Sequence, residues 1–359
     1  MTEAVILVGG KGTRLRPLTI DVPKPMLATA GVPFLHHVLA RARGAGIEHV
    51  VLATSYRPEA FEAGIGDGSS LGLRVDYVTE VEPLGTGGAI SNVGPLLESK
   101  PDEPVVIFNG DILSDHDVAA QVTAHVAADA DVSLHLTEVE DPRAFGCVPT
   151  EGGRVTAFLE KTPNPVTNLI NAGCYVFARR VIDGIPTGRR VSVERETFPE
   201  LLRDGANVLG HVAGGYWLDV GTPAAFVRGS CDLVLGRLAS SVLPGPTGQS
   251  LVLPGARVAD GAVLSGGTTV GAGAVVGSGA TVEGSVLLDG AVVEEGAVVR
   301  ASVVGQGARV GARTVLDGVV IGDRAVVGAD NELHAGCRVW RDAVLTPGSV
   351  RFSSDQPST

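Results

Sequence analysis

The chain has 359 residues and a formal net charge of −12, with 44% hydrophobic and 19% charged residues. This composition excludes wholesale disorder, and no run of about 18 apolar residues is present, so we expect no membrane-spanning segment. The acidic balance argues against a nucleic-acid-binding protein, which usually carries a basic face.

Strand and helix signals alternate over about the first 235 residues. The spacing of apolar residues over 33–46 predicts a helix that ends at a glycine. Short apolar runs predict strands at 4–8, 49–54, 74–80, 105–111 and 130–139. Short apolar strands separated by helices predict an α/β domain with a mostly parallel sheet covered on both faces. The ligand site of such a sheet lies beyond the carboxyl ends of its strands, here at 9–16 and 109–111.

The pattern changes after a linker at 240–250 (SSVLPGPTGQS). From Val258 onward an aliphatic residue recurs about every six positions, and three five-residue units start at Val282, Val299 and Leu316, which are 17 residues apart. Three short sides per coil predict a triangular parallel β-helix, and the pattern resembles the left-handed β-helices built from hexapeptide repeats. We therefore expect domains at 1–239 and 251–350, and a flexible tail at 351–359.

A glycine-rich segment with basic residues, GGKGTRLRPLT (9–19), follows the first predicted strand. Glycines let backbone N–H groups approach phosphate oxygens, and Lys and Arg supply countercharge. The segment is neither a Walker A loop nor a dinucleotide-binding GxGxxG. Together with PKPM (23–26) it resembles the GGxGTRLxPxT and PKP signature of sugar-nucleotide pyrophosphorylases.

The resemblance covers nearly the whole chain. Further matching segments are 80–88 (EVEPLGTGG), 109–111 (NGD), 145–146, 160–161, 171–173 (NAG) and 217–221 (WLDVG). The segments EPLGT, INAG, SVERETFP and YWLDVGTP, followed by a β-helix, are most similar to the mannose-1-phosphate guanylyltransferases. The resemblance implies a Rossmann-like nucleotidyltransferase domain that makes GDP-mannose and pyrophosphate from GTP and mannose 1-phosphate. One departure is Thr162, where the family usually has proline after the lysine.

The implied reaction is attack of a sugar-phosphate oxygen on the α-phosphorus of the nucleotide. The nucleophile is already an anion, so the site must bring two polyanions together rather than supply a general base. We expect Arg14 to bind the β- and γ-phosphates, Lys24 to neutralise the reacting phosphates and Lys161 to hold the sugar phosphate. Asp111 and Asp219, each after a short apolar run, are the candidates for binding Mg²⁺.

The remaining site candidates follow from the matched segments. For the nucleotide they are Gly9, Gly10, Gly12, Thr13, Glu80, Gly85 and Thr86. For the sugar they are Gly146, Glu160, Asn171 and Gly173. A carboxylate accepts hydrogen bonds with two oxygens and suits the adjacent N1–H and N2–H₂ donors of guanine. The family's loop spacing favours Glu80 for this contact, with Glu82 as the alternative.

Alternative functions remain open at this stage. The same chemistry could use glucose 1-phosphate with dTTP, UTP or ATP, or the chain could be a non-catalytic paralogue that senses nucleotide sugars. The β-helix could transfer acetyl groups, although no acyl-acceptor motif is visible, and we expect it to form a homo-oligomer instead. The four cysteines have no CxxC spacing, which predicts free thiols in a reducing cytoplasm. The first residues, MTEAVILVGG, do not resemble a signal peptide.

Overall fold

The computed structural model describes residues 2–334 and 336–351. The chain forms two compact units, which we call the sheet unit and the β-helix unit. The sheet unit contains residues 2–10 and 35–217, and the β-helix unit contains residues 11–34 and the described residues from 218 onward. The predicted tail at 351–359 lies outside the described residues except for Arg351. Most of the glycine-rich segment thus belongs to the same unit as the β-helix.

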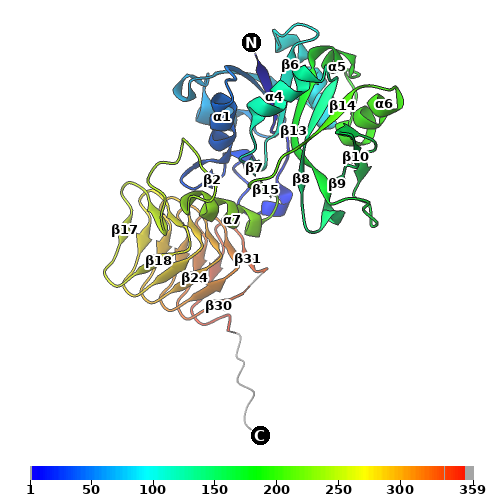
Figure 1. The fold of residues 1–359 in the computed structure, drawn as a ribbon. Coiled ribbons are helices and arrows are strands. Elements are labelled where there is room, and N and C mark those ends of the chain that lie inside the picture. The colour runs from blue at the N-terminus through cyan, green and yellow to red at the C-terminus, as the bar shows by residue number, and fades with distance from the viewer. Residues whose placement is uncertain (1, 335, 352–359) are drawn as a thin grey trace. The chain divides into compact units, whose positions relative to one another are not determined.

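The sheet unit is built on one large mixed sheet with the strand order β10-β11-β14-β8-β13-β6-β1-β4-β5 (Figure 1). Its strands are β1 (Glu3–Leu7), β4 (His49–Thr54), β5 (Arg74–Thr79), β6 (Pro104–Asn109), β8 (Val132–Glu138), β9 (Gly146–Cys147), β10 (Thr150–Glu151), β11 (Arg154–Val155), β12 (Leu159–Glu160), β13 (Leu169–Ala178) and β14 (Val208–Val212). The predicted strands at β1, β4, β5, β6 and β8 are confirmed. β5, β4, β1 and β6 are parallel, whereas β13 runs antiparallel to both β6 and β8.

Helices pack against both faces of this sheet. They are α1 (Phe34–Gly44), α2 (Pro58–Ile65), α3 (Gly85–Val93), α4 (Val118–Ala127), α5 (Arg179–Gly184) and α6 (Phe198–Arg203). Successive residues of a strand point to opposite faces, so Val5 and Ile107 share a buried cluster with Ile90 of α3. On the other face, the Arg41 guanidinium of α1 lies over the Phe108 ring, 5.3 Å from its centroid. The apolar runs at β1, β4 and β6 are continuous because both faces are covered.

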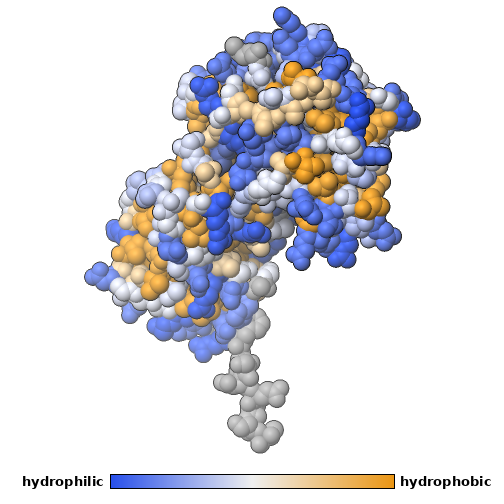
Figure 2. Space-filling view, in the orientation of Figure 1, coloured by the Kyte–Doolittle hydropathy of each residue, from blue (hydrophilic) through white to orange (hydrophobic). Residues whose placement is uncertain are grey.

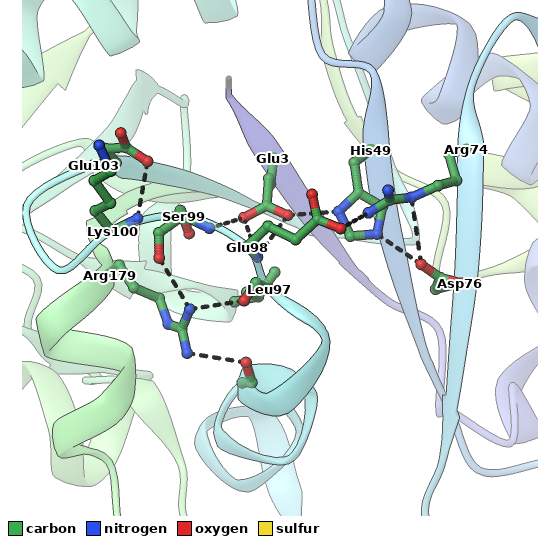
Figure 3. A network of polar contacts seen from close by, with 11 residues as sticks. Glu3, His49, Arg74, Asp76, Leu97, Glu98, Ser99, Lys100, Glu103 and Arg179 are labelled. Carbon is green, nitrogen blue, oxygen red and sulfur yellow. Dashed lines mark hydrogen bonds and ion pairs between the residues drawn. The ribbon is translucent and has the colours of Figure 1, made fainter.

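A buried carboxylate ties the amino end of β1 to its neighbours (Figure 3). Glu3 is 1% exposed and accepts hydrogen bonds from the backbone N–H groups of Glu98 and Ser99 and from Nδ1 of His49, at 2.5–3.0 Å. Burial alone would raise the pKa of Glu3, but these hydrogen bonds outweigh it and lower the pKa. Nε2 of His49 continues the network to Asp76 at 2.9 Å. The network lies at the edge of the sheet opposite to the expected site.

The C-terminal part is a three-sided parallel β-helix within the described residues. One side contains β16 (Ser250–Val252), β19 (Thr268–Val270), β22 (Val286–Leu287), β25 (Val303–Val304), β28 (Val320–Ile321) and β31 (Arg338–Val339). The next contains β17 (Arg257–Val258), β20 (Val275–Val276), β23 (Val292–Val293), β26 (Arg309–Val310), β29 (Val326–Val327) and β32 (Val344–Leu345). The third contains β18 (Val263–Ser265), β21 (Thr281–Glu283), β24 (Val298–Arg300), β27 (Val315–Asp317) and β30 (Glu332–Leu333).

The predicted register of the β-helix is confirmed by its interior. Val282, Val299 and Leu316 occupy equivalent positions in successive coils, and all three are fully buried. Each such side chain contributes about 1.5–3 kcal/mol when it leaves water. The architecture is consistent with the left-handed β-helix expected from the repeat.

The β-helix unit also contains α7 (Pro223–Val234) and the segment 11–34. That segment forms two short 3-10 turns, η1 (Thr13–Leu15) and η2 (Lys24–Met26), and a hairpin of β2 (Ala28–Thr29) and β3 (Val32–Pro33). Thr222 caps the amino end of α7, because its side chain accepts a hydrogen bond from Ala225 N. α7 packs on the side of the β-helix that contains β19 and β22. Among the described residues, none of the helices has the length and apolar character needed to cross a membrane.

Candidate active site

The carboxyl ends of β5, β4, β1 and β6 lie at the same edge of the sheet unit, because these strands are parallel. The segments that follow them supply most of the predicted site residues. After β1 the chain reaches Gly9, whose carbonyl accepts a 2.5 Å hydrogen bond from the Ser55 hydroxyl beyond β4. Gly10 follows and is exposed. β1 lies between β4 and β6: the chain runs from β1 outward to β4 and β5, and then returns to β6 on the other side of β1. This reversal of strand order is the arrangement that forms a ligand crevice in doubly wound sheets.

Glu80 follows β5 and points inward. Its backbone N–H donates to Thr54 O at 2.8 Å, and its side chain is 8% exposed. Oε2 accepts a 3.3 Å hydrogen bond from Leu84 N, whereas Oε1 is buried and has no hydrogen-bond partner among the described residues. Burial raises the pKa of Glu80, and the bond from Leu84 N offsets this only in part. The alternative base contact, Glu82, is exposed.

The start of α3 is joined to the segment 191–194. Gly85 begins the helix, and the N–H of Gly87 donates to Val191 O at 2.9 Å. The Thr86 hydroxyl donates to Glu194 Oε2 at 2.8 Å and accepts a 3.0 Å bond from Val193 N. Thr86 was predicted to bind the nucleotide, but in the structure its hydroxyl holds the loop at 191–194 in place. Residues 192–199, which contributed only to the family resemblance in the sequence, support the α3 loop in the structure.

Asp111 lies in a tight turn at the carboxyl end of β6. Gly110 N donates to Leu7 O at 3.0 Å, which ties this turn to the end of β1. Asp111 is half-buried and precedes β7 (Ile112–Ser114). The side chain of Asn109, the last residue of β6, has a buried Oδ1 without a hydrogen-bond partner among the described residues. Asn109 was not singled out from the sequence, although it belongs to the NGD motif.

The predicted sugar residue Asn171 is held by two contacts in β13. Its Oδ1 accepts a 3.0 Å bond from Gly173 N, and its Nδ2 donates to the Tyr175 hydroxyl at 2.8 Å. Tyr175 is fully buried, and burial raises its pKa well above the usual value despite hydrogen bonds to Asn171 and Asn109. A neutral tyrosine thus links the NAG and NGD segments, which lie far apart in the sequence.

Gly146, Glu160 and Lys161 are brought together by the pairing of β9 with β12, in which Glu160 lies opposite Gly146. Lys161 N donates to Phe145 O at 3.2 Å, and Lys161 Nζ lies 3.7 Å from Glu160 Oε1. The Lys161 side chain is 63% exposed, so this ion pair is weak and the ammonium group remains accessible.

An aromatic contact connects this hairpin to the NAG segment. The Phe145 ring packs edge-to-face on Trp217 at a centroid distance of 5.3 Å, and Trp217 Nε1 donates to Ala172 O at 2.9 Å. All predicted sugar residues therefore belong to one connected region of the sheet unit.

In the β-helix unit, the glycine-rich segment folds back on itself. Gly12 has φ +59°, and its carbonyl accepts hydrogen bonds from Leu15 N at 2.9 Å and from the Thr19 hydroxyl at 2.8 Å. Thr13 is the first residue of η1. A Cβ atom at Gly12 would lie 2.9 Å from Cβ of Lys24, so the turn brings the two predicted phosphate-binding segments into contact.

Arg14 and Asp219 meet at Gly221. Asp219 ends β15 (Trp217–Asp219), and α7 begins shortly after it. A Cβ atom at Gly221 would lie 2.6 Å from Nη2 of Arg14 and 2.9 Å from Oδ1 of Asp219. A guanidinium group and a carboxylate that face the same glycine form a small polar cradle, which a side chain at that position would fill.

Within each unit, then, the predicted residues are grouped. The sheet unit holds Gly9, Gly10, Glu80, Gly85, Thr86, Asp111, Gly146, Glu160, Lys161, Asn171 and Gly173. The β-helix unit holds Gly12, Thr13, Arg14, Lys24 and Asp219. In the part of the chain that the structure describes, no group of three or more His, Cys, Asp or Glu side chains is placed to hold a metal ion.

Comparison with known proteins identifies the family of this chain. A family profile described as Nucleotidyl transferase matches residues 3–234, and one described as GMPPB C-terminal domain matches residues 246–351. A mannose-1-phosphate guanylyltransferase of Mycobacterium tuberculosis is 60% identical over 259 residues, which are 72% of this chain and 71% of that protein. A mannose-1-phosphate guanyltransferase beta-B of Xenopus laevis is 36% identical over 266 residues, 71% of this chain and 72% of that protein.

A similar solved structure is that of HddC from Yersinia pseudotuberculosis complexed with GMP-PN. It has a TM-score of 0.56 and 28% sequence identity, and the match covers 64% of this chain and 98% of that chain. The fold is that of a nucleotidyl transferase. The chain belongs to this family, in the branch that contains the mannose-1-phosphate guanylyltransferases.

Proposed function

We propose that the protein makes GDP-mannose and pyrophosphate from GTP and mannose 1-phosphate. The similarity to the guanylyltransferases of Mycobacterium tuberculosis and Xenopus laevis supports this function. The structural observation that carries it is the inward-facing carboxylate of Glu80, whose Oε1 has no hydrogen-bond partner among the described residues.

Glu80 provides the basis for selecting guanine. A carboxylate only accepts hydrogen bonds, and guanine presents two adjacent donors, N1–H and N2–H₂. Uracil and thymine present one N–H between two acceptors, and adenine presents a donor beside an acceptor. Each of these bases would place at least one acceptor against a carboxylate oxygen, which costs binding energy in a buried site.

The phosphates of GTP are assigned to the glycine-rich turn. The guanidinium fork of Arg14 matches the β- and γ-phosphates, and Lys24, which packs against Gly12, supplies charge close to the turn. During the reaction a sugar-phosphate oxygen forms a bond to the α-phosphorus, and the bond from that phosphorus to the oxygen bridging to the β-phosphate breaks. Pyrophosphate leaves as an anion, so these side chains stabilise charge and need not transfer a proton.

The family generally uses a divalent metal ion, and we propose that Asp111 and Asp219 hold Mg²⁺ in this chain. Two carboxylates are a suitable donor set, because Mg²⁺ is usually bound by one or two carboxylates together with substrate phosphates and water. Gly221 has no side chain to cover Asp219 Oδ1. When bound, the ion would offset the negative charge of the phosphates.

The sugar phosphate is assigned to the region around β9, β12 and β13. Lys161 has an accessible ammonium group for the phosphate, and Glu160 lies beside it. Asn171, Gly146 and Gly173 offer an amide side chain and backbone groups for the sugar hydroxyls. Mannose and glucose differ only in the direction of the C2 hydroxyl, so the two sugar phosphates must be compared directly in the assay.

A screen of pyrophosphate release tests the proposal. Four nucleoside triphosphates are combined with mannose, glucose and galactose 1-phosphates in the presence of Mg²⁺. We expect the highest kcat/KM for GTP with mannose 1-phosphate. A higher value for dTTP or UTP with glucose 1-phosphate would overturn the assignment in favour of the same chemistry on another pair. Nucleotide-sugar binding without turnover would favour a sensor.

We also propose that the β-helix forms a homo-oligomer. Its outward faces carry half-buried valines in register, and at the ends of these columns Val263 is 53% and Val344 is 67% exposed. Figure 2 shows apolar side chains among polar ones on this part of the surface. Light scattering should give an oligomer for the wild-type chain and a smaller species for Val263→Glu or Val344→Glu. A monomeric wild-type chain would contradict the proposal.

We propose a cytoplasmic location because the cysteines are free thiols. Cys147, Cys174, Cys231 and Cys337 are free thiols, and the first three are buried. Free thiols are typical of proteins kept in a reducing compartment.

A further inference from the structure

The last coil of the β-helix contacts the glycine-rich turn that carries Arg14. Nη1 of Arg338 donates a 2.7 Å hydrogen bond to the carbonyl oxygen of Arg16. Arg341 forms an ion pair with Asp21. The partners are 322 and 320 residues apart in the sequence, and all four belong to the β-helix unit. Two guanidinium groups from one coil thus hold the segment that precedes Lys24.

The turn is rigid enough to transmit a constraint from these two contacts to Arg14. Arg16 N donates to Thr13 O at 3.3 Å, and Leu18 N donates to Leu15 O at 3.1 Å. Together with the hydrogen bonds to Gly12 O, these bonds close successive turns around Arg14. A shift at the Arg16 carbonyl would therefore move the Arg14 backbone with it.

Apolar packing alone does not fix this segment against the β-helix. A pocket of about 140 Å³ that is open to solvent lies between them, lined by Leu18, Met26 and Leu27 on one side and by Leu288, Gln306 and Asp323 on the other. Side chains on the two sides of this pocket are therefore not in continuous apolar contact. The far end of the segment is better anchored, since Ala30 N donates to the Ser230 hydroxyl of α7 at 2.9 Å. The two arginine contacts therefore secure the end of the segment that binds phosphate.

We propose that Arg338 and Arg341 are positioning residues for GTP, which act by holding the glycine-rich turn so that Arg14 meets the phosphates. This proposal rests on the function proposed above. It assigns the β-helix a part in the reaction besides oligomerisation. Because the turn carries Arg14 and none of the candidates for the sugar, the two arginines should affect GTP rather than the sugar phosphate.

The first test is steady-state kinetics of Arg338→Ala and Arg341→Gln. We expect the KM for GTP to rise about 3- to 10-fold in each variant, which corresponds to the net contribution of one ordinary hydrogen bond or one half-exposed ion pair. The KM for mannose 1-phosphate should stay within about twofold. Arg313→Ala is the control, because Arg313 forms an ion pair with Asp330 inside the β-helix, through two hydrogen bonds of 2.8 Å.

Two further variants separate positioning from general damage. Arg338→Lys retains a donor and should recover part of the KM for GTP. The double variant Asp21→Asn with Arg341→Gln should raise that KM no more than either single change, because the two side chains act as one pair. Additive effects, or equal rises for both substrates and for the Arg313→Ala control, would overturn the proposal.

Hydrogen exchange gives a measurement that does not depend on turnover. In the Arg338→Ala, Arg341→Gln double variant, amides of residues 12–21 should exchange faster than in the wild type, while interior amides of the β-helix stay unchanged. An unchanged exchange rate at 12–21 would also refute the positioning role. If the wild type proves inactive with GTP but this local change is seen, the proposed function fails while the contact to the turn stands.

Discussion

Replacing Glu80 by Gln is the sharpest test of how this site selects its base. The amide is nearly the same size as the carboxylate, and its oxygen can keep the bond from Leu84 N. Its NH₂ group would then occupy the place of the buried Oε1 and face the N–H donors of guanine. The variant loses one charge-assisted hydrogen bond and leaves a buried donor unpaired, which together cost about 2–3 kcal/mol. That corresponds to a loss of about 30- to 150-fold in kcat/KM for GTP.

The assay is kcat/KM for GTP, dTTP and UTP in the wild type and the variant. The gap between GTP and the pyrimidine nucleotides should narrow in Glu80→Gln, because the amide supplies the donor that those bases need. Glu82→Gln is the control, since Glu82 is exposed two residues away. If both variants keep the wild-type ranking of nucleotides, backbone groups of 84–88 must read guanine instead.

The same residue makes a prediction about pH. Burial raises the pKa of Glu80 in the protein without nucleotide, and only the ionised form accepts from guanine. As the pH falls toward that raised pKa, the ionised fraction falls, so kcat/KM for GTP should decline on the acid side. The Glu80→Gln variant has no group to titrate at this position and should lack that decline. An identical acid limb in both proteins would assign it to another group.

The remaining predictions concern the metal, the cradle and the fold. Asp111→Asn and Asp219→Asn should each lower kcat by at least about a hundredfold with an unchanged Tm, and near-normal rates would remove them as metal ligands. Gly221→Ala should raise the KM for GTP about tenfold, because its Cβ would lie 2.6 Å from Nη2 of Arg14. Glu3→Gln should cost about 1.5–3 kcal/mol in urea unfolding at pH 7. Since the folded pKa of Glu3 is lowered, its contribution is present above the unfolded pKa and is lost as the pH falls through the folded pKa, so the two proteins should converge in acid.

The features that were predictable from sequence are those encoded by local periodicity. Val282, Val299 and Leu316 recur every 17 residues, and that spacing gave the register of the β-helix because each coil repeats the previous one. The apolar run at β6 likewise predicted a buried strand. The direction of β13 was not predictable in this way, since its run of buried residues suits an antiparallel partner as well as a parallel one.

The candidate site residues were predicted from motifs, but the contacts that hold them in place were not. Thr86 was expected to contact the nucleotide, and the structure uses its hydroxyl to bind Glu194, 108 residues away. The buried tyrosine that links Asn109 and Asn171 was also unforeseen. Contacts of this kind depend on tertiary packing and leave no local pattern.

One long-range contact did leave a signal in the repeat itself. Along one outward column of the β-helix the residues in register are Leu251, Thr269, Val286, Val303, Val320 and Arg338, with three consecutive valines before the arginine. The three valines are at most 4% exposed. A fourth valine would have continued this column, so the stacking of coils gives no reason for a guanidinium group at the last position. Its reason is the carbonyl of Arg16 in the glycine-rich turn. The departure of Arg338 from the repeat pattern therefore marks the coil at which the β-helix contacts the segment that carries Arg14.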